Sequence, residues 1–400
     1  MKEFQGKKIL ILVENLPVPL DRRVWQEAKA LKNKGAMVSI ICPAGKGFYK
    51  KYEVLQNIAI YRHSLPLEAR TPSGYLIEYP AALFWEFILS IKCLFQRGFN
   101  VIHACDPPDL IFLIGAFYKI FGKKFVFDHH DLNPELYIAK FGKKGLIYRI
   151  LLLLERLSFK TADISIATNN SFKEIAAGRG GMRSDNIFIV RSGPEIEKFK
   201  PVEPEAKYKK GKKYLIGYLG VIGKQDGLHY MLEACDYLVN KKGRKDIHFI
   251  CIGGGTELDN VMKYAEELKL KDCIDFTGMV YDNRVLLKIL STVDVCIATD
   301  IYNEMNNMST MNKIMEYMAL KKPIVQFDLK EGRFTADKAS LYARPDDPID
   351  MARRILKLLE DPVKRKEMGD FGYNRIKNKL AWKYEKENLH RAYKKLFSDF

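Results

Sequence analysis

The sequence predicts an α/β protein built from two doubly wound, parallel-sheet domains. Short Val- and Ile-rich segments alternate along the whole chain with longer segments that carry apolar residues at helical spacing. A polar stretch rich in Lys, Pro and Glu interrupts this alternation at residues 201–213, and the pattern then starts afresh. With 400 residues, the chain exceeds the size at which one core usually keeps growing, so two domains are expected.

The composition is that of an ordinary soluble globular protein, with 47% hydrophobic and 29% charged residues and no low-complexity tract. The 66 Lys and Arg residues outnumber the 49 Asp and Glu residues, which gives a formal net charge of +17. This balance favours a negatively charged partner, such as nucleic acid, an anionic membrane surface or a phosphorylated substrate. Charge alone does not distinguish among these partners.

The cysteines and the apolar segments favour a cytoplasmic protein. The seven cysteines are an odd number without a CxxC pair, which is typical of reduced thiols and not of a disulfide or zinc framework. The apolar run at residues 9–13 is too short for a signal peptide and predicts a strand. Charged residues interrupt the apolar stretches 81–95 and 146–159, so neither is expected to cross a bilayer.

The first half is expected to begin with a βαβ unit and to continue the same alternation. A glycine, Gly35 or Gly122, follows each of the first two helical segments, where glycine commonly ends a helix. This order calls for a parallel sheet covered by helices on both faces. The expected strands are residues 8–14, 37–43, 100–105, 124–130, 162–169 and 186–193, and the expected helices are residues 23–34, 108–121, 146–161 and a segment from about residue 171.

The second half repeats this architecture without a detectable sequence repeat. We expect a first domain over residues 1–200, a second over 201–381, and a C-terminal helix over 382–400 that returns to the first domain. Ligands bind such sheets beyond the carboxyl ends of the strands, so a cleft between the two domains is the expected active site. The expected strands are residues 214–220, 246–255, 273–278, 293–299, 322–328 and 340–343, with helices between them.

The segment Ser309–Val325, which reads STMNKIMEYMALKKPIV, is the most informative part of the chain. Ser309 or Thr310 is expected to cap a helix that ends before Pro323. A helix N-terminus offers free N–H groups and the positive end of a dipole, which suit a diphosphate.

Three polar residues of this segment are expected to share one face of the helix. Lys313 and Glu316 are three residues apart, and Asn312 and Glu316 are four apart. Lys313 can add a full positive charge for a diphosphate, and the Glu316 carboxylate can accept hydrogen bonds from both ribose hydroxyls. The alternative is that Lys313 and Glu316 are simply an exposed Lys–Glu pair on an ordinary helix without a ligand.

This segment resembles the donor-site helix of the family 4 retaining glycosyltransferases of the GT-B fold, commonly written E-x7-E followed by A-M-A-x-G-x-P-V. The second glutamate of that pattern matches Glu316, whereas the first falls on Met308. In the family the first glutamate is implicated near the reacting sugar. A methionine stands at that position here, so the resemblance leaves this role without a candidate residue. The STMNKIMEYMA form is similar to a sub-group that makes bacterial surface polysaccharides.

The resemblance extends over nearly the whole chain. Residues 217–228 are similar to the first strand and turn of the family's donor domain, where most members carry an arginine and a lysine. These positions are Val221 and Asp226 here, which leaves Lys224 and Lys313 to neutralise the diphosphate. A plain tight turn would explain the glycines of this stretch equally well.

Two further glycine-bearing turns resemble the family's donor site. Residues 253–256 end a strand and open a helix, and residues 276–280 resemble the segment whose backbone contacts the nucleotide base. Structural packing would explain their residue types as well. The donor-binding residues implied by the resemblance are Gly220, Lys224, Gly254, Gly278, Met279, Ser309, Thr310, Asn312, Lys313 and Glu316.

Residues 127–135, which read FDHHDLNPE, resemble the family's H-D-x-x-P-E segment. We match the family's functional histidine to His130, which would contact the transferred sugar or steady charge near the anomeric carbon, with Asp131 orienting it. A histidine that only caps a turn is the alternative. The resemblance therefore implies His130, Asp131 and Lys313 as the catalytic residues.

A metal site is not expected. His129 and His130 lie between two aspartates, but consecutive residues do not easily converge on one ion, and the chain has no HExxH spacing. The resemblance implies a reaction without metal or cofactor, in which the substrate is a UDP-, GDP- or dTDP-sugar.

The loop at residues 16–24 lies where the family has a loop that reaches toward the acceptor. Prolines replace the glycines common there, so this loop is expected to be stiff. Arg22 and Arg23 are candidate contacts to an acceptor phosphate, although a solvated basic turn would look the same.

The acceptor implied by the resemblance is a glycan, expected to be lipid-linked. The aromatic-rich stretch 81–95 and nearby basic residues are compatible with peripheral binding to an anionic membrane surface, and a helix packed on the sheet is the alternative. The basic residues are Lys92, Arg97, Lys119, Lys123, Lys124, Lys140, Lys143 and Lys144.

Two other functions are compatible with parts of the sequence. A nucleic-acid-binding protein would fit the net charge, but the basic residues are spread along the chain without a recognition helix or a base-stacking pattern. A sugar-nucleotide epimerase of the same two-domain kind is the closer alternative, and it should turn over the donor without any acceptor.

Overall fold

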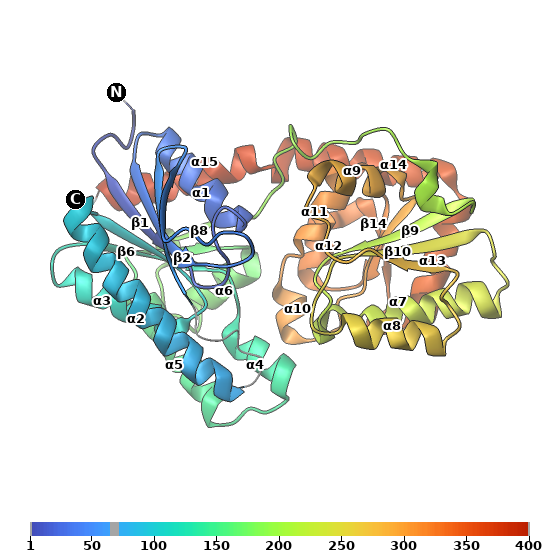
Figure 1. Ribbon diagram of the computed structural model, residues 1–400, viewed down its shortest axis with the longest axis horizontal. Helices are drawn as coiled ribbons and strands as arrows, with labels where there is room; N and C mark the ends of the chain where they lie inside the picture. The colour runs from blue at the N-terminus through green and yellow to red at the C-terminus, as the bar shows by residue number, and fades with distance from the viewer. Residues whose placement is uncertain (1, 65–71, 399–400) are drawn as a thin grey trace. The chain divides into compact units, whose positions relative to one another are not determined.

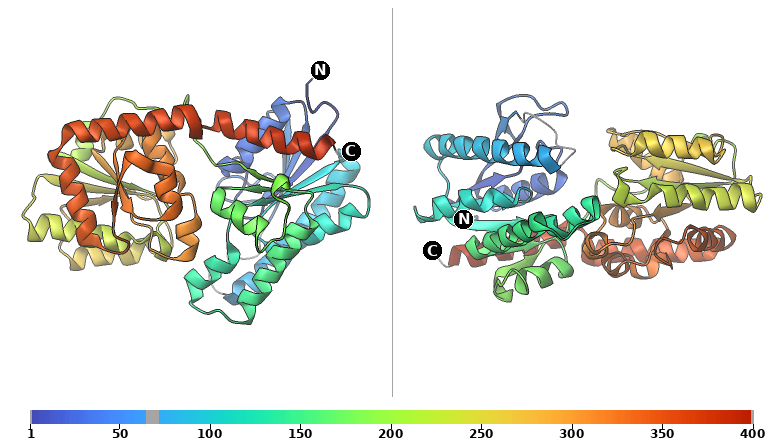
Figure 2. Two further views of the ribbon diagram at one scale, coloured as in Figure 1. Left: turned by 180° about the vertical axis from the view of Figure 1, so that it is seen from behind. Right: turned by 90° about the horizontal axis from the view of Figure 1, so that it is seen from below.

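The computed structural model describes residues 2–64 and 72–398, and it divides into two compact α/β units (Figure 1). Unit 1 comprises Met1–Arg191 and Glu385–Phe400, and unit 2 comprises Ser192–Tyr384. In each unit, helices cover both faces of one sheet (Figure 2). The two parallel-sheet α/β domains predicted from the sequence are therefore confirmed.

Unit 1 contains an eight-stranded sheet in the order β3-β4-β2-β1-β5-β6-β7-β8. All neighbours are parallel except β3 and β4, which pair antiparallel at one edge. Neighbouring strands β1 and β5 form a switch point, where the direction of winding changes. The strands are β1 Lys8–Leu12, β2 Met37–Pro43, β3 Tyr52–Leu55, β4 Ile58–His63, β5 Val101–Cys105, β6 Lys124–His129, β7 Ile164–Ala167 and β8 Ile187–Ile189.

The edge hairpin of β3 and β4 was not predicted. Its two-residue turn places Gln56 and Asn57 at φ values of 50° and 64°, which matches the twist of an antiparallel pair. Asn is common at such positions and Gln is not, so the Gln-Asn pair is a weak turn signal. The short strand β3 has no buried residue and therefore shows no apolar pattern.

The helices predicted at residues 23–34, 146–161 and from about residue 171 are found within one residue, whereas the one predicted at 108–121 starts at Phe112 and α4 (Asn133–Phe141) was not predicted. Asp21 caps the first helix by accepting a hydrogen bond from the Val24 N–H at 3.0 Å, and Asn169 caps α6 in the same way through Phe172. No helix among residues 2–64 and 72–398 is long and apolar enough to span a membrane. The helices are α1 Arg22–Asn33, α2 Pro72–Gln96, α3 Phe112–Lys119, α4 Asn133–Phe141, α5 Leu146–Thr161 and α6 Asn170–Ala177.

The C-terminal helix α15 covers Trp382–Ser398, and the two further residues expected in it lie outside the described residues. From Glu385 onward it belongs to unit 1. Its Tyr393 ring lies against Phe4, and its His390 ring faces the carbonyl of Ala30 in α1 at 3.3 Å. Tyr393 is fully buried, so the end of the chain forms part of the unit 1 core.

Unit 2 contains a six-stranded parallel sheet in the order β11-β10-β9-β12-β13-β14. Strand β9 lies between β10 and β12, so the winding reverses at β9 and β12. Ligands of such sheets bind beyond the carboxyl ends of the strands at this point. The strands are β9 Tyr214–Leu219, β10 Ile247–Ile252, β11 Ile274–Phe276, β12 Val295–Ala298, β13 Ile324–Phe327 and β14 Ser340–Ala343.

One helix start in unit 2 differs from the prediction. The expected cap at Ser309 or Thr310 is wrong, because helix α11 starts at Asn312 after Met311, which makes no side-chain cap. Ser309 instead ends the preceding helix, where its hydroxyl donates to the Met305 carbonyl at 2.7 Å. The helices are α7 Leu228–Asp236, α8 Leu258–Glu267, α9 Asn283–Thr292, α10 Glu304–Met308, α11 Asn312–Ala319, α12 Lys330–Ala336, α13 Pro348–Glu360 and α14 Pro362–Arg375.

Candidate functional site

Three loops of unit 2 pack against each other beyond the carboxyl ends of β9, β10 and β11. The N–H of Gly220 donates to the carbonyl of Ile252 at 3.0 Å, and the N–H of Gly253 donates to the carbonyl of Gly278 at 3.0 Å. A Cβ atom on Gly253 would lie 1.8 Å from the Gly220 carbonyl oxygen, so only glycine fits there. The sequence-predicted glycines Gly220 and Gly278 therefore lie in one glycine-rich wall at the switch point.

The same wall contains two more of the predicted donor-binding residues. Gly254 lies beside Met279, whose Cγ would be 3.2 Å from an added Cβ. Met279 itself is exposed, and it is preceded by Gly278 at a φ of 66°. An apolar side chain next to open backbone groups suits the flat face of a nucleotide base.

Lys313 of α11 lies in a buried ion pair. Its Nζ is 2.8 Å from Asp300 Oδ1, 3.2 Å from the Tyr218 hydroxyl and 4.7 Å from the centre of the Tyr218 ring. The side chain is only 8% exposed. Burial acts to lower the pKa of Lys313, but the carboxylates of Asp300 and Asp226 outweigh it and the pKa is raised. The ammonium is therefore charged and already paired, which the sequence did not predict.

Asp226 occupies the position where the resembled family carries a lysine. Its carboxylate accepts a hydrogen bond from the Gly223 N–H at 3.0 Å and lies 3.9 Å from Lys313 Nζ. Burial raises the pKa of Asp226 to about 6, with Lys313 acting in the opposite direction and Asp300 adding to the rise. Two carboxylates thus share one ammonium at the carboxyl ends of β9 and β12.

Helix α11 is fixed to the sheet by the residue that follows Glu316. The Tyr317 hydroxyl accepts from the Leu219 N–H at 2.7 Å and donates to the Ile297 carbonyl at 3.2 Å. These bonds hold the first turns of α11 against the ends of β9 and β12. Glu316 is buried at 7% exposure, and Asn312 is exposed at the start of the helix.

The other predicted donor-side residues lie on neighbouring loops of unit 2. Lys224 is exposed in a short turn and lines a surface pocket of about 400 Å³ together with His229, Glu257 and Tyr264. Ser309 and Thr310 are half-buried in the link between α10 and α11. Lys224 is thus the more exposed of the two lysines expected to face a diphosphate.

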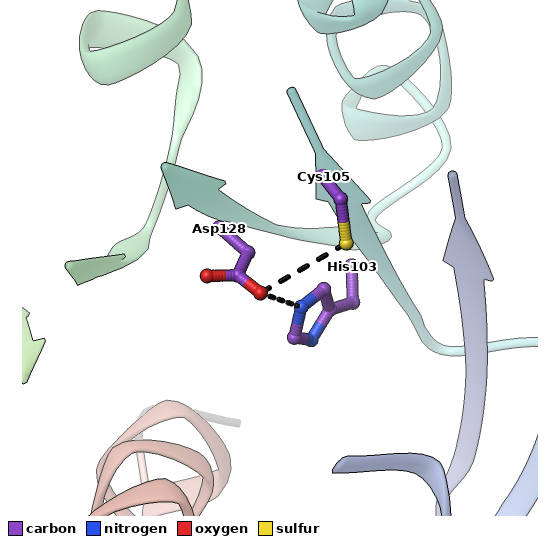
Figure 3. A group of neighbouring side chains, drawn as sticks. All are labelled: His103, Cys105 and Asp128. Carbon is purple, nitrogen blue, oxygen red and sulfur yellow. Dashed lines mark hydrogen bonds and ion pairs between the residues drawn. The ribbon is translucent and has the colours of Figure 1, made fainter. Parts of the chain in front are cut away.

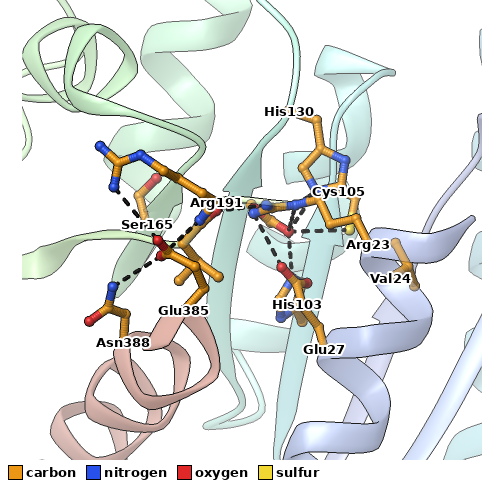
Figure 4. Close-up of polar contacts among 12 residues, drawn as sticks. Arg23, Val24, Glu27, His103, Cys105, His130, Ser165, Arg191, Glu385 and Asn388 are labelled. Carbon is orange, nitrogen blue, oxygen red and sulfur yellow. Dashed lines mark hydrogen bonds and ion pairs between the residues drawn. The ribbon is translucent and has the colours of Figure 1, made fainter. Parts of the chain in front are cut away.

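In unit 1, His130 follows β6 and is bound by Asp128. Its Nε2 lies 2.6 Å from Asp128 Oδ2, and the Asp128 side chain is fully buried (Figure 4 shows the surroundings of His130). Among the described residues the His130 ring contacts Asp128 and Arg23 and makes no hydrogen bond to Asp131, so the expectation that Asp131 orients His130 is wrong. Asp131 starts the next turn, and its backbone N–H lies 3.4 Å from Asp106 Oδ1.

Arg23 is buried, so it does not belong to a solvated basic turn, and its guanidinium is already bound within unit 1. Its Nη2 lies 2.7 Å from Asp128 Oδ1 and 3.2 Å from Glu27, and its Nη1 donates to the Val190 carbonyl at 2.7 Å. The Arg23 side chain is 9% exposed and reaches Asp128 near the end of β6. Arg22 is exposed at the first position of the helix.

Asp106 is a further residue of this region that sequence reasoning missed. It follows β5, and its Oδ1 accepts the backbone N–H of His130 at 2.5 Å. Burial raises the pKa of Asp106 well above its usual range, and Asp109 and Asp131 add to the rise. Its place at a strand end before two prolines was the only signal available in the sequence.

His103, Cys105 and Asp128 form a buried group whose ligand-type atoms lie within 4.8 Å of one another (Figure 3). The Asp128 oxygens are already used, since they accept from Arg23 and His130 and Oδ2 is 3.2 Å from His103 Nε2. Burial raises the pKa of the Cys105 thiol well above its usual range. Because the Arg23 guanidinium binds the Asp128 carboxylate, His103, Cys105 and Asp128 form part of a hydrogen-bonded ion-pair network.

Comparisons with known proteins give one consistent result. Residues 20–198 match the family model described as Glycosyltransferase Family 4, and residues 213–361 match the one described as Glycosyl transferases group 1. The chain is 25% identical over 362 residues to an uncharacterized glycosyltransferase of Methanocaldococcus jannaschii, covering 87% of this chain and 86% of that protein. It is also 25% identical to the capsular polysaccharide biosynthesis glycosyltransferase CapM of Staphylococcus aureus, over 62% of this chain and 66% of that protein.

Solved structures share the fold at low sequence identity. Sucrose-phosphate synthase from Thermosynechococcus elongatus superposes with a TM-score of 0.80 at 17% identity, over 98% of this chain and 100% of that chain. Anabaena HepE in complex with UDP and glucose superposes with a TM-score of 0.73 at 15% identity, over 96% and 99% of the two chains.

Proposed function

The chain is a GT-B glycosyltransferase of the group 1 and family 4 kind, and from this premise we propose that it transfers a sugar from a nucleoside diphosphate to a glycan hydroxyl with retention at the anomeric carbon. The observation that carries the proposal is that Lys313 of α11 meets Tyr218 and Asp300 at the switch point of unit 2, where the glycine-rich wall follows β9 and β10, with the buried Glu316 one turn further along the same helix. A buried carboxylate beside close-packed glycine loops suits a ribose and a diphosphate.

The donor is a nucleoside diphosphate sugar bound by unit 2. The support is the position of the site and the similarity in fold to a protein solved with UDP and glucose. In this arrangement Glu316 accepts hydrogen bonds from the ribose hydroxyls, and the Gly278–Met279 backbone faces the base. UDP and GDP sugars carry both ribose hydroxyls that Glu316 would bind, whereas a dTDP sugar carries only the 3′-hydroxyl.

The charge of the leaving diphosphate is carried by protein groups and not by a metal. Lys224 is the exposed cation on the loop after β9, and the N-terminal N–H groups of α11 add a positive end of a dipole. Lys313 lies between the Asp226 and Asp300 carboxylates beside this position, and its single positive charge offsets part of their negative charge and so weakens their repulsion of the phosphates. The proton of the acceptor hydroxyl passes to the departing phosphate oxygen.

The acceptor is a lipid-linked or phosphate-bearing glycan used in surface polysaccharide synthesis. The support is the similarity to a capsular polysaccharide enzyme and an exposed apolar surface on α2, α3 and α5 of unit 1, which we call the apolar face. Arg22 is the candidate for an acceptor phosphate. The apolar face consists of Phe84, Trp85, Ile88 and Phe95 of α2, Leu113 and Phe117 of α3, Ile120 and Phe121 just after it, and Leu146, Ile147, Ile150 and Leu153 of α5.

The helices that carry the apolar face are neighbours, because α3 lies against both α2 and α5. The Phe87 and Phe117 rings of α2 and α3 are 5.1 Å apart, and α3 also packs against α5. The opposite side of α2, with Glu86, Ser90 and Cys93, is buried on the sheet. Exposed Lys92, Lys143 and Lys144 lie on or beside the same helices. An apolar surface bordered by lysines suits the headgroup region of an anionic membrane.

Product analysis with the full-length protein tests this function. We expect incubation with the cognate sugar nucleotide and a glycan acceptor to release the nucleoside diphosphate only when the acceptor is present, and the new glycosidic bond to keep the donor's anomeric configuration. Conversion of the donor to an isomeric sugar without acceptor would identify an epimerase instead. An inverted product would refute retention.

A further inference from the structure

A pocket of about 340 Å³ opens on unit 1 beside the last turns of α2, and we propose that it binds the phosphate group of an anionic phospholipid. It is lined by Tyr52 of β3, Tyr61 of β4, Lys92 and Gln96 of α2, and Arg97 just after that helix. The inference rests on the proposed membrane surface for the source of the phosphate, and not on the transfer reaction.

The pocket is separate from the region of His130. Lys8, the first residue of β1, donates from its Nζ to the Arg97 carbonyl at 2.8 Å, so the pocket lies near the amino end of that strand. His130 instead follows the carboxyl end of β6, which runs parallel to β1 through β5. A phosphate bound in the pocket is therefore distinct from one on a glycan acceptor.

Two cations give the pocket its charge. Among the described residues, neither Lys92 nor Arg97 has a carboxylate partner, and none of the lining residues is acidic. The Arg97 Nε–H donates to Ser39 Oγ at 3.1 Å, which orients the guanidinium and leaves its two Nη groups for a ligand. Glu53 of β3 pairs with Arg62 and does not line the pocket. Two cations without acidic neighbours favour an anion, and the forked guanidinium suits phosphate oxygens.

Two tyrosine rings complete the wall. Tyr52 and Tyr61 lie opposite each other in the antiparallel β3–β4 pair, with their ring centres 5.0 Å apart. Tyr61 is buried, and its hydroxyl oxygen lies 3.0 Å from Gln96 Oε1, which ties the edge hairpin to α2. Tyr52 is 47% exposed. The pocket therefore has a fixed inner wall and an exposed aromatic rim, against which the glycerol part of a lipid can pack.

The pocket borders the apolar face, which favours a lipid over a soluble phosphate. Lys92 is four residues after Ile88 and three before Phe95, and these spacings place side chains on one face of a helix. Ile88 and Phe95 are 40% and 85% exposed. A phosphate held by Lys92 and Arg97 thus has an apolar surface beside it for acyl chains. Inorganic phosphate makes no use of that surface.

Calorimetry with the full-length protein tests the pocket with soluble probes. The probes are dihexanoyl-phosphatidylglycerol below its critical micelle concentration, glycerol phosphate and inorganic phosphate. We expect saturable binding of the lipid, and affinities about tenfold or more lower for the other two probes. Equal affinity for inorganic phosphate would overturn the assignment to a lipid, and a lack of saturable binding of the lipid would overturn the site.

Two matched double variants separate the pocket from general charge attraction. Lys92→Gln/Arg97→Gln should weaken binding of the short-chain lipid about tenfold or more, because two charged donors are lost. Lys92→Gln alone changes an exposed side chain and should weaken it severalfold. The control Lys143→Gln/Lys144→Gln removes the same charge just before α5 and should bind as the wild type does.

The outcome of these variants is independent of sugar transfer. An equal loss of binding in the two double variants would show that net charge and not the pocket attracts the lipid, and would overturn the proposal. Because the readout is binding alone, this failure leaves the transferase function standing. Conversely, a protein that transfers no sugar and still loses lipid binding only in Lys92→Gln/Arg97→Gln would refute that function and keep the site.

Discussion

Lys313 and Asp300 form a buried ion pair in unit 2, with Nζ 2.8 Å from Oδ1 and with both side chains almost inaccessible to water. Asp226 lies 3.9 Å from the same ammonium on its other side. The pair lies beside the glycine-rich wall at the carboxyl ends of β9 and β12. It therefore links the stability of unit 2 to the charge of the proposed donor site.

Loss of Lys313 should destabilise the protein. Lys313→Ala leaves two buried carboxylates without their cation, and the removal of one partner from a buried pair typically costs about 3–5 kcal/mol. We expect a lower thermal unfolding midpoint and partial recovery in the double variant Lys313→Ala/Asp300→Ala. The matched control is Lys366→Ala, which breaks the exposed pair of Lys366 with Asp370 in α14 and should leave the midpoint unchanged. Equal effects of the two single variants would show that Lys313 has no special role.

The stability of the protein should fall as the pH rises from about 5 to about 8, because of Glu14. Burial raises the pKa of Glu14 from 4.5 to about 8, with Glu78 adding to the rise. The folded state binds this proton more tightly than the unfolded chain does. The contribution is therefore complete below the ordinary pKa of 4.5 and is lost as the pH approaches about 8.

Unfolding midpoints measured across this pH range test the assignment. Glu14→Gln should remove a slope of up to about 1.4 kcal/mol per pH unit in the free energy of unfolding. Glu174→Gln, at an exposed position of α6 in the same unit, serves as the control and should keep the wild-type slope. A wild-type slope that survives Glu14→Gln would assign the titration elsewhere, for example to the buried Glu86.

Turnover should not require a divalent metal. The proposed stabilisation of the leaving group depends on Lys224 and on the start of α11, so saturating EDTA is expected to leave the rate unchanged. Activity that is lost on chelation and restored by added Mn²⁺ or Mg²⁺ would contradict this part of the account.

The protein should bind vesicles of phosphatidylcholine and phosphatidylglycerol through the apolar face. Phe95 and Ile120 are 85% and 79% exposed, and Phe95→Asp/Ile120→Asp should reduce co-sedimentation at low salt severalfold. Binding should also rise with the phosphatidylglycerol content and fall with salt, because each basic residue near an anionic surface contributes about 1 kcal/mol. The control Met262→Asp changes an exposed apolar residue of unit 2. Wild-type protein that stays in the supernatant at low salt would exclude this surface as a membrane site.

The sequence was sufficient for the fold because strand and helix periods are local properties. The apolar run at residues 247–252 predicts strand β10, and the glycine after α1 predicts the end of that helix. Neither prediction needs information from the rest of the chain. The β3–β4 hairpin was missed because its edge strand has no buried face. The cap of α11 was assigned wrongly because the Ser309 hydroxyl can bond either a backbone N–H at the start of α11 or the Met305 carbonyl of α10. The position of α10 decides in favour of Met305.

The partners of the site residues could not be predicted, because they depend on contacts between distant parts of the chain. Lys313 was expected to meet an anion, and the structure pairs it with Asp300 from the end of another strand. His130 was expected to be oriented by the adjacent Asp131, whereas Asp128 and Arg23 lie around it. In both cases the motif identified the residue. Its charged partner comes from a distant position: Asp300 is 13 residues from Lys313, and Arg23 is 107 residues from His130.

Titration of the full-length protein with a panel of UDP, GDP and dTDP and their sugars, followed by calorimetry, tests the donor site most directly. We expect one base to bind, and Glu316→Ala to weaken that binding by roughly 2–3 kcal/mol because a charged hydrogen-bond acceptor for the ribose is lost. The exposed Glu267→Ala in α8 is the matched control and should bind as the wild type does. Unchanged nucleotide affinity in a folded Glu316→Ala protein would contradict the placement of the donor on α11.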